Sequence, residues 1–188
     1  MQLEIVSSQD PHVEGSVAGP GGAPIHQEPI RVADPGARCA AMAPALSSAF
    51  ARVLASGRYI IGPEVAACEA ELEDYVGVPA VGAGCGTDGL ILALRAVGVQ
   101  PGDEVVTAAH TATATVAAIH AVGAEPVLAE IAADSCCVDP ASVARLIGPR
   151  TRAIVAVHMF GEPADAVTLA ALAAAHGIAL IEDCAQAH

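Results

Sequence analysis

From about residue 80 onward, short apolar runs alternate with segments whose apolar residues recur at helical spacing. The run over 153–157 is apolar throughout, which is typical of a strand covered on both faces. The pattern predicts strands over 80–83, 104–108, 125–129, 152–157 and 178–182. It predicts helices over 87–97, 112–122, 140–147 and 165–175. This alternation indicates an α/β fold with a mostly parallel sheet, helices on both faces and right-handed crossovers.

The N-terminal part of the chain has a different pattern. Residues 1–36 are rich in proline and glycine, so we expect a flexible N-terminal arm there and a folded domain over 37–188. The domain should start with a helix from about Ala40 to the Ser56–Gly57 pair. Its apolar face is formed by Met42, Leu46, Phe50, Val53 and Leu54. A second helix should open at Pro63.

Composition and charge exclude several classes of function. The net charge is −13 and all eight cationic side chains are arginines, so a nucleic-acid partner is not expected. No apolar run approaches the roughly 18 residues that cross a bilayer, and the first residues do not resemble a secretion signal. The six cysteines show neither disulfide nor zinc spacing, which indicates reduced thiols in a cytoplasmic protein without a structural metal.

A glycine-rich turn follows the first predicted strand. Gly84, Gly86 and Gly89 spell G-x-G-x-x-G, and backbone amides at the start of the next helix favour an anion such as phosphate. The dinucleotide fingerprint also requires an acid at the end of the second strand, where this chain has Ala109-His110. A phosphate cradle of another kind is therefore favoured over a nicotinamide-binding Rossmann site or a purely structural turn.

Asp183 lies directly after the last predicted strand, with Gln186 three residues later. A carboxylate in this position can pair with a protonated pyridine nitrogen and keep pyridoxal phosphate (PLP) an effective electron sink. The alternative is that Asp183 only caps a following helix, which is a common use of aspartate.

Taken together, the motifs resemble the DegT/DnrJ/EryC1/StrS family of PLP-dependent sugar aminotransferases of fold type I. Their order and spacing match the N-terminal portion of that family over about four fifths of the chain. The matching stretches are SGRYIIGPEV (56–65), CGTDGL (85–90), GDEVV (102–106), VHMFGEPAD (157–165) and IEDCAQAH (181–188).

The resemblance implies the truncated large domain of a fold type I enzyme and a role for particular residues. Thr87 and the Asp88 amide, next to Gly86, would hold the PLP phosphate. Asp183 would pair with the pyridine nitrogen and Gln186 would contact the 3-oxygen side of the ring. A substrate-entrance loop would contain Gly57, Tyr59 and Ile61, and further candidates facing the site are His110, His158 and His188.

Three departures from the family pattern are informative. Cys85 replaces the usual serine, which weakens hydrogen bonding at the phosphate turn. Ala112 stands where many members place an aromatic ring over the cofactor, and we expect His110 to cover the ring instead. The chain contains no lysine, so the Schiff-base lysine of the family is expected downstream of residue 188, together with the rest of the sheet and the C-terminal domain.

The expected function is transfer of an amino group from glutamate or glutamine to a keto-sugar, commonly nucleotide-linked, by a homodimer that binds PLP. A related PLP dehydratase, in which histidine replaces the lysine, stays open because the deciding position is absent. This chain by itself carries no catalytic lysine, so one alternative is that it is a non-catalytic truncated remnant. A third hypothesis is an NAD-binding domain.

Overall fold

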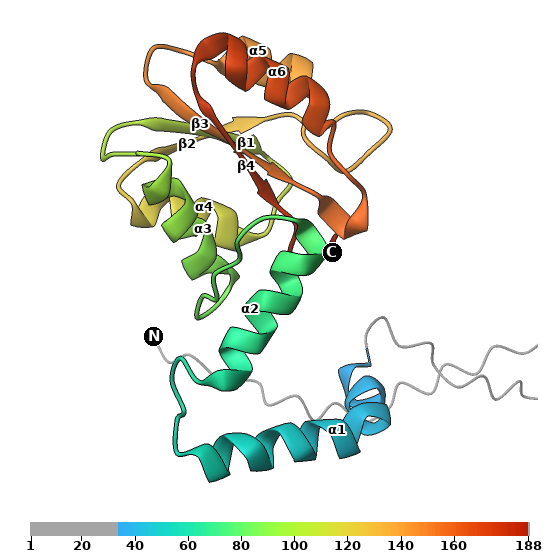
Figure 1. The fold of residues 1–188 in the computed structure, drawn as a ribbon. Helices are drawn as coiled ribbons and strands as arrows, with labels where there is room; N and C mark the ends of the chain where they lie inside the picture. Colours follow the sequence, from blue (N-terminus) through green and yellow to red (C-terminus); the bar gives the residue numbers. More distant parts are fainter. Residues whose placement is uncertain (1–33, 188) are drawn as a thin grey trace, which may run out of the picture. The chain divides into compact units, whose positions relative to one another are not determined.

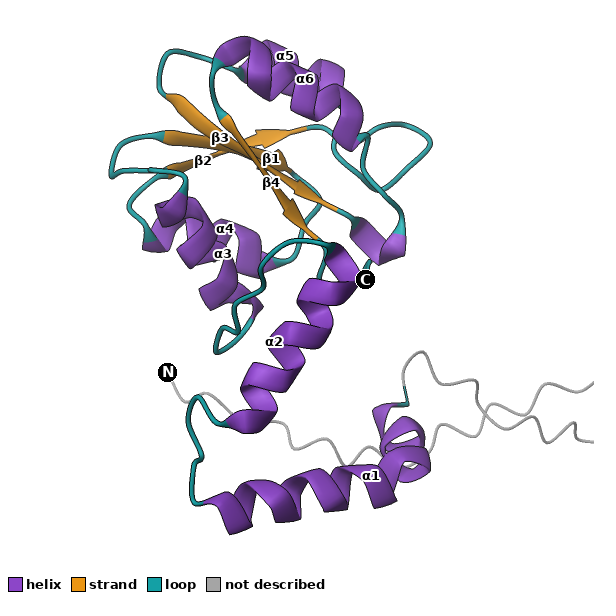
Figure 2. Ribbon diagram, in the orientation of Figure 1, coloured by secondary structure: helices purple, strands orange, loops and turns teal. Residues whose placement is uncertain are grey.

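The computed structural model describes residues 34–187, which fall into two compact units. The first unit contributes the described residues up to Glu64, and the second begins at Val65. Figure 1 labels the helices and strands, and Figure 2 separates them by type. The expected arm lies outside the described residues except for its last three positions, 34–36.

The first unit is built on α1 (Pro35–Ser56), which starts about five residues earlier than the sequence pattern indicated. Asp34 caps the helix by accepting a 2.9 Å hydrogen bond from the Ala37 N–H, and proline at the first helical position is already in helical geometry. Gly57 ends the helix in the left-handed conformation, as predicted. Within α1, Arg52 forms a bidentate ion pair with Glu64, with N–O distances of 2.6 and 3.1 Å.

Helix α1 qualifies the expectation that no segment could cross a membrane. It has 22 residues and a mean hydropathy of 1.3 over its best window, and none of its residues is buried. By length and composition alone it could span a bilayer, although core helices of soluble proteins pass the same test.

The second unit alternates helices and strands. Helix α2 (Pro63–Val76) begins at the junction of the two units. The remaining elements are α3 (Gly86–Ala96), β1 (Glu104–Ala108), α4 (Thr113–Ala121), β2 (Glu125–Ala129), α5 (Pro140–Leu146), β3 (Thr151–Val157), α6 (Ala166–His176) and β4 (Ala179–Asp183). Each of these agrees with its predicted bounds to within one residue. A short 3-10 turn, η1 (Met159–Gly161), was not predicted.

The four strands form one parallel sheet with the order β2-β1-β3-β4. Register is continuous between β3 and β4, where Ala153 faces Ala179 and Val157 faces Asp183. All connections are strand–helix–strand crossovers, so the predicted α/β class with a parallel sheet is confirmed.

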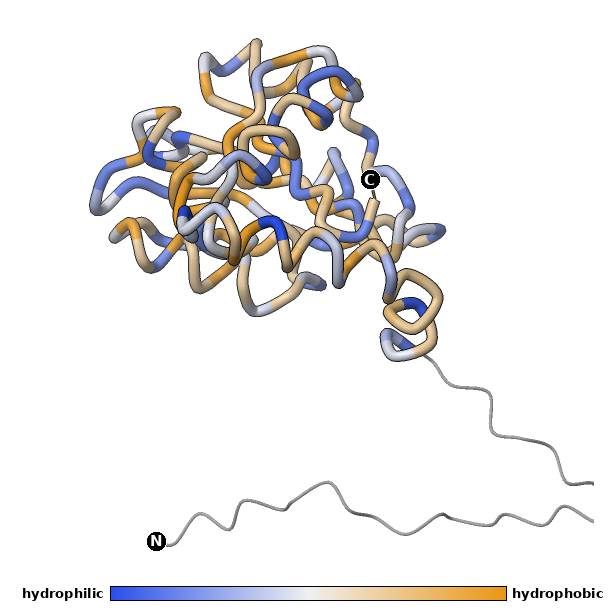
Figure 3. Tube along the Cα trace, turned by 60° about the horizontal axis from the view of Figure 1, so that its bottom comes forward, coloured by the Kyte–Doolittle hydropathy of each residue, from blue (hydrophilic) through white to orange (hydrophobic). Residues whose placement is uncertain are grey.

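Helices cover both faces of the sheet, as Figures 1 and 2 show. Leu90 and Leu94 of α3 and Ile119 of α4 pack on one face against Val105 and Val155. The opposite face carries α5 and α6, whose buried residues include Val143 and Leu169. Figure 3 shows hydrophobic and hydrophilic positions alternating along most of the described chain. Among the described residues, the buried core is built mainly from Ala, Val, Leu and Ile and contains no phenylalanine or tyrosine.

The prediction of a strand over 80–83 is wrong. These residues form no strand, and Val81 is 86% exposed. A strand is stable only when its backbone groups pair with a neighbour, and no described segment supplies one here. The segment is held instead by the Gly82 N–H, which donates a 2.7 Å hydrogen bond to Oε1 of Glu69 in α2.

Candidate functional site

The candidate site lies at the carboxyl edge of the parallel sheet, where ligands gather in α/β folds. The segments after β1, β3 and β4 all begin at this edge because the strands run in the same direction. Helix α3 precedes β1 and runs back toward the start of that strand, so its N-terminus lies at the carboxyl edge as well. Helix α3 also contacts β4 directly. The glycine turn and the Asp183 segment, about 100 residues apart in sequence, therefore belong to one edge.

The start of α3 has the features of an anion site. The first intrahelical hydrogen bond runs from the Gly89 N–H to the Cys85 carbonyl, so the amides of Gly86, Thr87 and Asp88 precede the helical ladder. Cys85 is the N-cap residue of α3 and makes no side-chain cap hydrogen bond. The Asp88 carboxylate lies close over Gly84, since a Cβ at Gly84 would be 2.8 Å from Oδ2 of Asp88 and would require that exposed side chain to move.

Asp183 is the last residue of β4, half-buried at its carboxyl end. Side chains alternate along a strand, and Ala179 and Ile181 pack on the face covered by α3 and α4. Asp183 therefore shares the face that carries the phosphate turn, and Glu182 belongs to the opposite face. The helix-cap interpretation is wrong for the described chain, since Oδ1 of Asp183 accepts from the Ala185 N–H at 3.1 Å in a turn and not at a helix start.

Gln186, Phe160 and His110 form a contact chain across the edge. The Phe160 N–H donates a 2.7 Å hydrogen bond to Oε1 of Gln186. The rings of Phe160 and His110 are tilted by 53° with centroids 5.9 Å apart, a favourable aromatic geometry. Segments following β1, β3 and β4 are thus joined by side chains, although the sequence pattern placed no partner beside Gln186.

His158 is a buried structural residue and does not face solvent at the edge. Its Nδ1 accepts from the Ala164 N–H at 2.9 Å, and its Nε2 lies 3.0 Å from Oε2 of Glu182. Of the two interpretations open for this residue, ligand-facing or hydrogen-bonded within the fold, the structure supports the second.

The remaining candidates are less constrained. Ala112 is the exposed N-cap residue of α4, and its methyl group offers no ring surface. Gly57, Tyr59 and Ile61 belong to the first unit, so their role at a substrate entrance stays a prediction. His188 lies outside the described residues.

Two residues at the edge received no role from the sequence. Phe160 lies inside the VHMFGEPAD stretch. The glycine that follows it, Gly161, could have indicated a tight turn at this point of the sequence. Glu182 directly precedes Asp183. Strand alternation predicts that its side chain lies on the opposite face of the sheet from Asp183, but it does not predict the partner, His158. Both were missed because their partners come from a distant segment of the chain.

The acidic end of β4 also affects its neighbouring thiol. Cys184 follows Glu182 and Asp183, and partial burial, reinforced by these two carboxylates, raises the pKa of its thiol above the ordinary value. Cys184 is therefore protonated at neutral pH and is a poor nucleophile.

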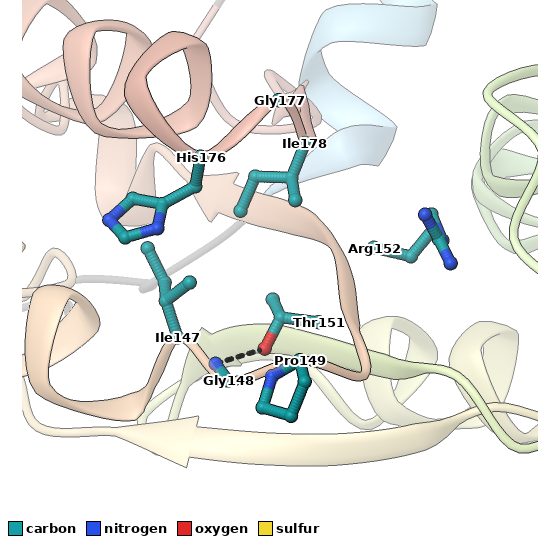
Figure 4. Close-up of a pocket in the computed structure, with 8 residues that line it drawn as sticks. All are labelled: Ile147, Gly148, Pro149, Thr151, Arg152, His176, Gly177 and Ile178. Carbon is teal, nitrogen blue, oxygen red and sulfur yellow. Dashed lines mark hydrogen bonds between the residues drawn. The ribbon is translucent and has the colours of Figure 1, made fainter.

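A cavity of about 410 Å³ lies at the opposite, amino edge of the sheet (Figure 4). Its wall includes Ile147, His176 and Ile178, and the Thr151 hydroxyl accepts a hydrogen bond from the Gly148 N–H there. Because Thr151 begins β3 and Ile178 precedes β4, this cavity is remote from the carboxyl edge and is not the candidate site.

Comparison with known proteins agrees with this geometry. The chain is 49% identical over 142 residues to dTDP-3-amino-3,4,6-trideoxy-alpha-D-glucose transaminase of Streptomyces venezuelae, covering 75% of this chain and 38% of that protein. The crystal structure of S. venezuelae DesV in complex with a ketimine intermediate superposes with a TM-score of 0.80 and 45% identity, over 82% of this chain and 42% of that one. NtdA of Bacillus subtilis, solved with bound cofactor PMP (pyridoxamine phosphate), gives a TM-score of 0.76 and 29% identity, over 78% of this chain and 34% of that one.

The chain thus spans about two fifths of the relatives it matches. The residues present fit the non-covalent half of a PLP site: a helix N-terminus with free amides, a carboxylate at a strand end on the same face, and an amide side chain beside it. The lysine that would hold the cofactor covalently is not in this sequence. A model of the DegT/DnrJ/EryC1/StrS aminotransferase family matches residues 42–188, and the chain belongs to that family.

Proposed function

We propose that this chain forms the cofactor-orienting half of a PLP-dependent aminotransferase that acts on a nucleotide-linked keto-sugar. The observation that carries the proposal is the convergence of the α3 N-terminus and the Asp183–Gln186 segment at one edge and one face of the sheet. Family membership and the substrate named for the Streptomyces relative support the sugar class.

Each residue has a separate task in this proposal. The Thr87 hydroxyl and the amides of Gly86, Thr87 and Asp88 bind the phosphate, since these amides precede the helical ladder and lie at the positive end of the helix dipole. Asp183 keeps a proton on the pyridine nitrogen, which it can do because its Oδ1 is already fixed by the Ala185 N–H. Gln186 contacts the 3-oxygen of the ring. The bound cofactor would supply the electron sink for amino transfer.

The covalent amine must come from outside these 188 residues, because the sequence contains no lysine. Completion of the site by further polypeptide and by a second subunit, with glutamate or glutamine as amino donor, belongs to the same proposal. The alternative for the chain alone is a non-catalytic remnant. The nicotinamide alternative rests on the spacing of Gly84, Gly86 and Gly89, and it is disfavoured because the strand that the fingerprint requires before the glycine turn is not formed at 80–83.

Pyridoxamine phosphate, which requires no lysine, tests the proposal on the chain itself. We expect saturable binding measured by fluorescence titration, competition by inorganic phosphate, and no competition by NAD. A Thr87→Val variant should bind more weakly, while an Ala93→Ser variant later in the same helix should bind as the parent does. Saturable binding of NAD, or no difference between the two variants, would contradict the proposal.

Activity needs a second experiment. Where the coding sequence continues past the codon for His188, we expect the longer protein, once expressed, to transfer ¹⁵N from labelled glutamate or glutamine to a nucleotide-linked keto-sugar. Formation of a deoxygenated sugar without incorporation of ¹⁵N would instead identify the related dehydratase.

A further inference from the structure

The turn between β3 and α6 is fastened by the imidazole of His158. The Ala164 N–H can only donate, so Nδ1 of His158 must carry no proton and the ring hydrogen lies on Nε2. Nε2 then donates to Oε2 of Glu182 at 3.0 Å. The main-chain N–H of His158 also donates to the Asp183 carbonyl at 3.1 Å. His158 is only 5% exposed. Two of these hydrogen bonds join His158 to β4, and the third joins the far end of the turn, at Ala164, to the His158 ring.

Within this turn Phe160 adopts an unfavourable backbone conformation. Its φ is +58°, in the left-handed region, and the residue is 68% exposed. Burial of the ring therefore does not offset the energetic cost of this backbone conformation. Gly161 follows at φ +85°, and a Cβ there would lie 3.2 Å from the Gln186 carbonyl oxygen. The positive φ angles of Phe160 and Gly161 orient the backbone so that the Phe160 N–H points at the Gln186 side chain.

This contact determines the orientation of the Gln186 amide. An N–H donor requires an acceptor, so the atom that faces Phe160 is the carbonyl oxygen Oε1 and not the nitrogen. The NH₂ group is consequently the free end of an exposed side chain. Gln186 in this orientation offers hydrogen-bond donors to a ligand at the edge.

We propose that His158 is a positioning residue for Gln186. Its contacts with Ala164 and Glu182 hold Phe160 in the left-handed conformation, and the Phe160 N–H then turns the Gln186 amide so that its NH₂ group faces the ligand. A donor at this point favours a deprotonated ring oxygen, and Asp183 favours a protonated ring nitrogen. The half-site therefore selects the dipolar form of a 3-hydroxypyridine phosphate, and this ligand assignment rests on the proposed function.

The positioning role can be tested without any ligand. Amide hydrogen exchange of Phe160, followed by NMR in the full 188-residue chain, reports the bond to Gln186. We expect Gln186→Leu to speed exchange at Phe160 roughly three- to tenfold, while Gln186→Glu, which keeps an acceptor, leaves it protected.

His158 variants complete the ligand-free test. His158→Leu should speed exchange at both Phe160 and Ala164, whereas His158→Asn, with an acceptor close to the Nδ1 position, should restore protection at both amides. Exchange at Ile154 in the sheet core serves as the folding control, because a variant that unfolds would lose protection there too. Unchanged exchange at Phe160 in His158→Leu, with Ile154 protected, would overturn the proposal.

A second experiment tests the ligand with 4-deoxypyridoxine 5′-phosphate, which has the ring oxygen, ring nitrogen and phosphate but no aldehyde. Its absorbance distinguishes the dipolar from the neutral form. We expect the parent chain to shift the bound ligand to the dipolar form, and Gln186→Glu to weaken binding at least tenfold by placing a carboxylate opposite the ring oxygen.

The two experiments separate the inference from the function on which it rests. Equal binding by Gln186→Glu would overturn the donor orientation. If the parent chain binds none of the analogue while the exchange pattern holds, the proposed function and the ligand assignment both fail, and the positioning of Gln186 by His158 stands.

Discussion

The main-chain carbonyl of Asp183 accepts a 3.1 Å hydrogen bond from the His158 N–H, which extends the pairing of β3 and β4 by one step beyond the strand ends. The residue proposed to face the pyridine nitrogen is thus held by its neighbouring strand through the backbone. Its side chain is held separately, by the Ala185 N–H. A substitution can therefore remove the charge of the Asp183 side chain without moving the residue.

Replacing Asp183 by asparagine should remove the charge and keep the geometry. Oδ1 of asparagine can still accept from Ala185, so we expect the free energy of unfolding to change by less than about 0.5 kcal/mol. Binding of 4-deoxypyridoxine 5′-phosphate should fall about tenfold or more, because a neutral amide does not stabilise a protonated pyridine nitrogen. Calorimetry and urea unfolding measure the two effects, and undiminished binding would show that Asp183 does not face the ring.

Leu94 in α3 anchors the face of the sheet that carries the candidate site. It is fully buried, whereas Leu92 in the same helix is 56% exposed. We expect Leu94→Ala to lower the free energy of unfolding by about 2–5 kcal/mol through lost burial and a cavity. Leu92→Ala, the same chemical change in the same helix, should stay within about 1 kcal/mol. Equal losses in urea unfolding would mean that α3 packs differently.

Asp139 caps α5 by accepting hydrogen bonds from the Ala141 and Ser142 amides at 2.9 and 3.0 Å. Asp139→Ala should reduce the free energy of unfolding by about 1 kcal/mol, because two helix-start amides lose their acceptor. Asp139→Asn keeps the acceptor and should recover most of that loss. If alanine and asparagine behaved alike in thermal unfolding, the cap would contribute nothing.

The thiol of Cys184 should ionise only at alkaline pH. Burial first, and then the charges of Glu182 and Asp183, raise its pKa above the ordinary 9.0. We therefore expect the midpoint of its alkylation rate by iodoacetamide to lie above pH 9.0. Glu182→Gln should lower that midpoint by removing one negative charge, while an acceptor for His158 remains. Mass spectrometry of the labelled peptide measures the rate, and a midpoint below 9.0 would contradict the predicted direction of the shift.

The second unit follows its hydrophobic pattern closely. Continuous apolar runs such as that of β3, and caps such as Asp139, are local signals, so strand and helix positions were predictable to within one residue. The segment over 80–83 carried the same kind of local signal and is not a strand. Its pattern was that of a strand, but a strand also needs a hydrogen-bonding neighbour, which local sequence does not supply.

The sequence by itself determined the family, the parallel sheet and the edge at which Thr87, Asp183 and Gln186 lie, because periodicity and motif order are properties of contiguous residues. Only the tertiary structure decided what surrounds them. It placed the Phe160 N–H on Gln186 and the His110 ring against Phe160, and it bonded the His158 ring to Ala164 and Glu182. These contacts join residues up to 50 positions apart in the chain, and strand register, which fixes them, arises only when the whole sheet forms.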